Sequence, residues 1–243
     1  MLSPESQSVI ASYLRLPIGV GCVTPYFNNR RAKIRAGLRA LIGKGSPREI
    51  VEEAEIIALR QKVSLTTLDE ATLKRFLVDV GLGIDCSGLA YHILDAESRA
   101  RTGSSLSRHL SLRVGFFRRL IARLRPAEQV SVRVLAHDAN SLPVKASDAR
   151  PGDILTLMST EYDHVLLIEH VTRHGSTTTI GYIHAFAWPT DGVYGHGVRR
   201  GTIEISGDDL PKARFEENGI TVNFAQGRSI EHMAVRRLRV FQK

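Results

Sequence analysis

The stretch GIDCSGLAY, residues 83–91, sets Cys86, one of only two cysteines, where a helix is expected to begin. The apolar residues of 89–96 recur at helical spacing, and the pattern ends before Gly103. Unpaired N–H groups and the positive dipole end in a first helical turn favour thiolate over thiol, which lowers a cysteine pKa. Gly83 and Gly88 fit a tight backbone that allows close approach. The stretch therefore predicts a reactive thiol, and the alternative is a small buried apolar residue.

Composition indicates one globular domain with insertions. The chain has 243 residues, of which 43% are hydrophobic, enough to bury a sizeable core. Cys22 and Cys86 form at most one bridge, which excludes a disulfide scaffold. No apolar run reaches the roughly 20 residues of a membrane span, and residues 1–5 lack the basic start of a secretory signal. We therefore expect a cytoplasmic protein, unless it is exported by another route or released by lysis.

The formal charge of +8 is concentrated in one segment, because residues 99–125 hold eight arginines and no acid. Within it, apolar residues at helical spacing alternate with Arg118, Arg119 and Arg123, which predicts a short basic amphipathic helix. An anionic wall polymer, a membrane surface or a nucleic acid would suit this helix. A helix docked on the core with a solvated arginine face is the alternative, and we claim no specific nucleic acid.

The pattern along the chain changes from helices to strands. A capping box at 46–49 opens a helix to about Gln61, and a second box at 67–70 opens one that ends at Gly81. A basic helix is also expected over 30–42. After Pro143, short apolar runs separated by turn residues predict strands at 154–158, 164–171, 177–186, 198–205 and 235–241. This order predicts an α+β fold with an antiparallel sheet of about five strands.

A cysteine nucleophile needs a proton acceptor, and two of the nine histidines stand out by position. His164 opens one expected strand, and His184 lies on the next, where a hairpin would bring the two side by side. They fit the roles of base and orienter. The other histidines are interpreted as core or edge residues. Zinc bound by Cys86, His164 and His184 is the alternative, but no close ligand pair is present, so we expect neither metal nor cofactor.

In order, the chain contains DCSG at 85–88, RPGDI at 150–154, His164-Val165 and IHA at 183–185. This series resembles the papain-like cysteine peptidases of the NlpC type, which cut peptides of the bacterial cell wall. The resemblance implies a papain-like sheet with the nucleophile at the N-terminus of a helix packed on it. It implies Cys86 as nucleophile, His164 as base and His184 as orienter. Thr24-Pro25-Tyr26 resembles the family's Pro-Tyr element, which implies that Tyr26 lines the substrate cleft.

The chain departs from that family by two insertions, a helical one at 30–82 and an arginine-rich one at 101–140, within a single domain of residues 1–243. Asp85 and Ser87 are candidate helix caps or substrate contacts, with capping preferred. Trp188 is a candidate cleft wall.

The expected function is amide hydrolysis through a thioester, with a peptide or peptidoglycan fragment as substrate. The alternatives are a membrane-associated lipid acyltransferase or thioesterase on the same fold, and a non-catalytic binding module.

Overall fold

The computed structural model describes residues 1–27, 39–112, 125–226 and 229–242. Within them the fold is α+β, and its strands form one antiparallel sheet in the order β1-β8-β2-β3-β4-β5-β6-β7. The strands are β1 Ser141–Val144, β2 Ile154–Met158, β3 Asp163–His174, β4 Thr177–Phe186, β5 Gly197–Ser206, β6 Arg214–Glu217, β7 Ile220–Val222 and β8 His232–Leu238.

The sheet has eight strands in the described residues, so the expectation of about five was too low. The five expected runs correspond to β2, β3, β4, β5 and β8, although β8 ends at Leu238 and a 3-10 turn follows it. The strands β1, β6 and β7 were missed because they span only four, four and three residues. Runs this short show no alternation that separates them from loops.

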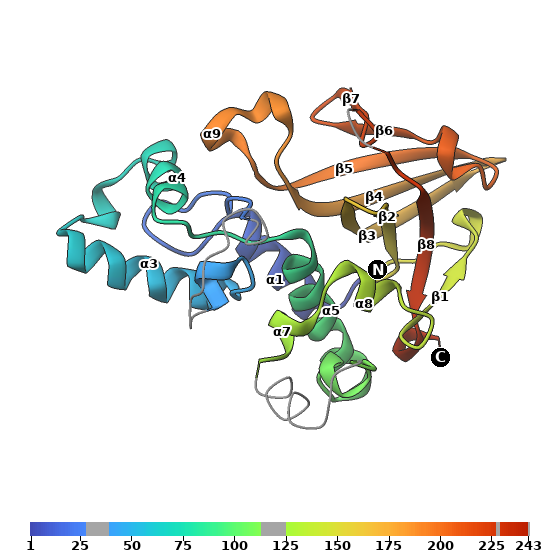
Figure 1. The fold of residues 1–243 in the computed structure, drawn as a ribbon, viewed down its shortest axis with the longest axis horizontal. Coiled ribbons are helices and arrows are strands. Elements are labelled where there is room, and N and C mark those ends of the chain that lie inside the picture. The colour runs from blue at the N-terminus through green and yellow to red at the C-terminus, as the bar shows by residue number, and fades with distance from the viewer. Residues whose placement is uncertain (28–38, 113–124, 227–228, 243) are drawn as a thin grey trace.

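The helices are α1 Pro4–Leu14, α3 Pro47–Gln61, α4 Glu70–Asp79, α5 Cys86–Thr102, α7 Pro126–Gln129, α8 Val132–Ala136 and α9 Gly192–Gly195. Figure 1 shows α1 and α5 in the middle of the molecule, between the sheet and the pair α3 and α4. The helix α5 contacts both α1 and the strands β3 and β4. No helix in the described ranges is both long and apolar enough to cross a membrane.

The predicted helix starts are largely confirmed. Ser46 caps α3 in a reciprocal box with Glu49. The second start was placed too early, because the cap of α4 is Asp69, whose carboxylate accepts the Thr72 N–H at 2.7 Å, while Thr67 lies in a 3-10 turn. Of the basic helix expected over 30–42, residues 39–42 form a 3-10 turn and 30–38 lie outside the described residues.

The arginine-rich helix expected around Arg118, Arg119 and Arg123 also lies outside the described residues.

Alternation along the strands divides the buried side chains between two cores. Val165 and Ile183 pack in the core that includes α1 and α5, whereas Leu166 and Tyr182 pack in a second core on the other side of the sheet. Successive side chains of a strand point to opposite faces, so one sheet supplies both cores. The strands β3 and β4 are therefore covered on both faces, which excludes water from their middle.

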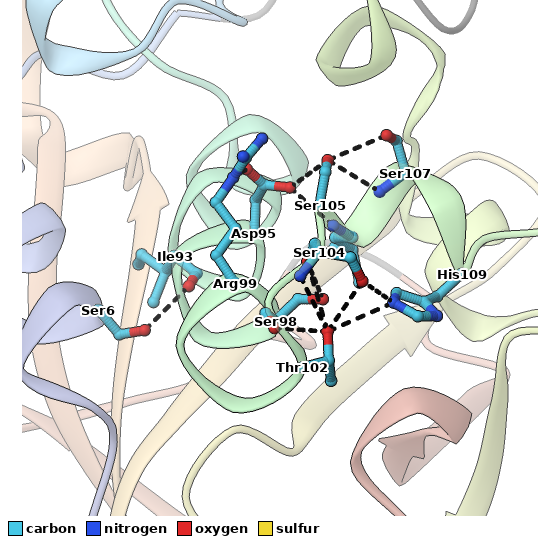
Figure 2. Close-up of polar contacts among 11 residues, drawn as sticks. Ser6, Ile93, Asp95, Ser98, Arg99, Thr102, Ser104, Ser105, Ser107 and His109 are labelled. Atoms are coloured by element: carbon cyan, nitrogen blue, oxygen red, sulfur yellow. Dashed lines mark hydrogen bonds and ion pairs between the residues drawn. The ribbon is translucent and has the colours of Figure 1, made fainter.

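The helix α5 is held in place by two of its own carboxylates, Glu97, which is buried, and Asp95, which is partly buried. Glu97, which is 1% exposed, accepts the Ser3 N–H at 2.8 Å and the Ser6 hydroxyl at 2.7 Å, and so fixes α1 to it. Figure 2 shows the C-terminal half, where Asp95 accepts the Ser105 hydroxyl at 2.7 Å and ties the following turn back to the helix. These contacts fix the axis of α5, and thereby the position of its first residue.

Candidate functional site

Cys86 is the first residue of α5, as the sequence predicts. The N-cap is Asp85, whose carboxylate accepts the Gly88 N–H at 2.6 Å, so capping is confirmed as its structural role. A Cβ on Gly88 would lie 2.7 Å from the Gly43 carbonyl oxygen, and one on Gly83 would lie 2.5 Å from that of Pro25. Both glycines therefore allow the close backbone approach that the sequence suggested.

Tyr26 lies close to the start of α5, although it is far upstream of Cys86 in the sequence. The Ile84 N–H donates to the Pro25 carbonyl at 2.9 Å, and the Phe27 N–H donates to the Ile84 carbonyl at 3.1 Å. This short parallel pairing sets Tyr26 beside the segment that leads into Cys86. The Tyr26 N–H also donates to His196 Nδ1 at 3.2 Å, so His196, interpreted from sequence as a core or edge residue, helps to position it.

His164 and His184 meet as predicted from the hairpin. His164 is the second residue of β3 and His184 lies in β4, and the distance from His164 Nε2 to His184 Nδ1 is 2.8 Å. Both side chains are 1% exposed. The His164 ring stacks on Tyr162 at 6.0 Å and on Phe224 at 5.6 Å between centroids. Packing thus fixes the plane of the His164 ring. Because Nε2 contacts His184, the second ring nitrogen of His164, Nδ1, points away from His184.

A pocket of about 470 Å³ lies over the start of α5 and β3. Cys86 and His164 both line it, and so do three of the four predicted substrate-binding residues, Tyr26, Asp85 and Ser87. Trp188 is not among its lining residues. Its ring packs on Phe186 at 4.7 Å and its Nε1 donates to Glu217 at 2.8 Å, which makes it a support behind the pocket wall.

Lys44 is a member of this site that sequence reasoning missed. Its Nζ lies 3.0 Å from Asp85 Oδ1, donates to Ser87 Oγ at 2.6 Å and to the Val130 carbonyl at 3.1 Å. Lys44 therefore partners both polar residues that flank the cysteine. The sequence marks Lys44 only by the glycines on either side of it, Gly43 and Gly45. Glycines occur in many loops, so this pattern does not identify a site residue.

The thiol pKa differs from the sequence expectation. Burial, followed by the nearby Asp85 carboxylate, raises the pKa of Cys86 from its ordinary value to about 12. Lys44 and the backbone N–H groups of Val165 and Ser87 lower it, but by less. The expected lowering at a helix start is therefore wrong for this site, and the thiol is neutral at pH 7. A thiolate then forms only when a base accepts the proton.

Alkylation by iodoacetamide should follow this raised pKa. We expect the rate at Cys86 to keep rising through pH 10, since the thiolate fraction grows until pH passes the pKa of about 12. At pH 7 the thiolate fraction is on the order of a thousandfold below that of a free cysteine. The measurement is labelling against pH in a Cys22→Ala background, because burial also raises the pKa of Cys22, to about 11.

Unfolding the same protein in urea provides the control, because the exposed thiol should then plateau above its usual pKa near 8.5. A plateau at or below pH 8.5 in the folded protein would contradict the raised pKa.

Glu217, the last residue of β6, is the second group that sequence reasoning missed. It is buried, and its Oε1 lies 2.9 Å from His184 Nε2. The line of contacts from His164 through His184 thus ends on a carboxylate. In the sequence Glu217 follows the half-exposed Glu216 in a short strand, and no local pattern distinguishes the two.

Within the described ranges, no group of three or more His, Cys, Asp or Glu side chains is arranged to hold a metal ion. No protein-family model, curated protein or solved structure matches this chain. The site is therefore interpreted from its own geometry.

Proposed function

We propose that the protein is a cysteine hydrolase that cleaves an amide bond through a thioester on Cys86. The observation that carries this proposal is that one pocket is lined by the thiol at a helix start and by His164, which is hydrogen-bonded to His184 at 2.8 Å. A nucleophile beside a base that is itself oriented by a third group is the arrangement that acyl transfer requires.

In the proposed reaction, His164 accepts the Cys86 proton as the sulfur attacks the amide carbonyl. This order suits a thiol whose pKa is raised, because no thiolate is needed before substrate binds. The backbone N–H of Cys86 serves as the oxyanion donor at the helix start. Imidazolium His164 then protonates the leaving amine, and water, with His164 as base, hydrolyses the thioester to the acid and the free thiol.

The proposed substrate is a peptide of bacterial cell-wall type, cut by endopeptidase or amidase action. Support comes from the resemblance to NlpC-type papain-like peptidases: the helix with the cysteine precedes strands that carry the two histidines. Tyr26 lines the pocket, which agrees with its role in that resemblance. The lipid acyltransferase alternative depends on Arg118, Arg119 and Arg123, which lie outside the described residues.

Product analysis tests the proposal. Purified wild-type protein and its Cys86→Ala variant are incubated with soluble peptidoglycan fragments, and the products are identified by mass. We expect each cut to add the mass of one water in the wild-type sample only. Release of free peptides indicates endopeptidase action, and separation of the sugar from the peptide indicates amidase action. Identical spectra from the two proteins would contradict amide hydrolysis at this site.

A further inference from the structure

The donors that converge on Glu217 come from two neighbouring strands and the segment between them. Its side chain is buried at the end of β6. Tyr182 Oη donates to Oε1 at 2.9 Å and Trp188 Nε1 donates to Oε2 at 2.8 Å. Arg199, itself paired with Asp191 at 2.7 Å, lies 3.7 Å from Oε2. Glu217 thus lies among donors, and His184 Nε2 lies 2.9 Å from its Oε1.

These contacts keep Glu217 ionised. Burial by itself acts to raise the pKa of Glu217, but the contacts with His184, Trp188 and Tyr182 outweigh it and hold the pKa below its ordinary value. Burial also raises the pKa of Tyr182, so its hydroxyl keeps its proton. A tryptophan N–H only donates. The carboxylate is therefore an acceptor toward every neighbour named here.

An acceptor at this position determines which nitrogen of His184 carries the proton. At 2.9 Å from Glu217 Oε1, a lone pair on His184 Nε2 would repel the carboxylate, so Nε2 carries hydrogen even though the approach is too oblique for a well-formed hydrogen bond. Burial lowers the pKa of His184, which leaves the ring neutral at pH 7. Its Nδ1 therefore holds a lone pair and accepts the Nε2–H of His164.

We propose that Glu217 is a positioning residue that sets the tautomer of His184, and through it that of His164, so that neutral His164 keeps a basic Nδ1 for Cys86. This inference rests on the proposed cysteine hydrolase function. The proton balance is closed: the Cys86 proton moves to His164 Nδ1 and is later given from there to the leaving amine, while the Nε2–H stays bonded to His164 and donates to His184 Nδ1 throughout. Glu217 neither gains nor loses a proton.

The variant that tests this is Glu217→Gln, which has nearly the same shape but offers an amide N–H to His184 Nε2. His184 is then free to hold its proton on Nδ1, which forces His164 into the tautomer that lacks a basic Nδ1. We expect kcat to fall on the order of a hundredfold or more with little change in KM. Glu216→Gln, one residue earlier on the same strand, is the matched control and should keep the wild-type kcat.

Imidazole 15N NMR provides a readout that needs no activity. We expect wild-type His184 to be protonated at Nε2 and unprotonated at Nδ1, and Glu217→Gln to shift it toward the Nδ1–H form. The opposite tautomer in the wild type overturns the inference, and so does a wild-type kcat in a folded Glu217→Gln variant. If wild-type protein cleaves no amide, the proposed function fails, and the NMR result still decides what Glu217 does.

Discussion

Replacing Cys86 with alanine is expected to reduce the rate of amide hydrolysis on the order of a thousandfold or more, because alanine has no sulfur that could form the thioester with the acyl group. The measurement is the single-turnover rate on the wall peptide identified by product analysis. Cys86 packs in the main core, so unfolding in urea should be recorded for the variant as well. A loss of rate in a folded variant assigns the chemistry to this thiol.

Cys22→Ala is the matched control, since Cys22 is a buried cysteine of the same core and is not a lining residue of the pocket. It should keep the wild-type rate, with only the modest stability cost of a small truncation. If Cys86→Ala hydrolyses the peptide as fast as the Cys22→Ala protein, the nucleophile lies elsewhere.

Replacing His164 is expected to have the second largest effect, on the order of a hundredfold to ten-thousandfold in kcat. With the thiol pKa at about 12, Cys86 depends on a base at neutral pH more than a cysteine with a low pKa would. The rate lost on His164→Ala should be partly recovered as pH rises toward that value, because hydroxide then supplies the thiolate. The pH profile of kcat/KM measures this recovery.

His174→Ala is the control on the same strand, because His174 is exposed at the far end of β3. His164→Gln, which fills more of the space than alanine, separates loss of the base from loss of packing against Tyr162 and Phe224. A flat pH profile for both His164 variants, with wild-type kcat/KM, would remove His164 from the mechanism.

The pKa of Cys86 illustrates how opposing effects are resolved by magnitude. A helix N-terminus contributes about 0.3–1 kcal/mol at an exposed site, which corresponds to less than one pKa unit. Full burial shifts a pKa by as much as about 3–5 units. Cys86 is 8% exposed, so burial wins and the pKa rises to about 12. Sequence reveals the helix start, but exposure depends on everything that packs over it.

Short stretches of sequence were enough to predict most of the longer helices and strands. The caps Ser46 and Asp85 and the five longest strands follow from interactions among residues a few positions apart, which a single stretch of sequence already contains. Where two local signals competed, as at Thr67 and Asp69, the start was misplaced by two residues. The hairpin of β3 and β4 likewise made the meeting of His164 and His184 predictable.

By itself, then, the sequence determined that Cys86 begins a helix and that His164 and His184 lie on strands that follow it. Only the tertiary structure decided what surrounds them. Lys44 meets Asp85 across 41 positions of sequence, and Glu217 meets Tyr182 across 35. Such partners depend on how the helices and the outer strands fold back over the site. The charge beside the thiol and the carboxylate behind the histidines are therefore properties of the packed molecule, because they arise from long-range contacts and burial.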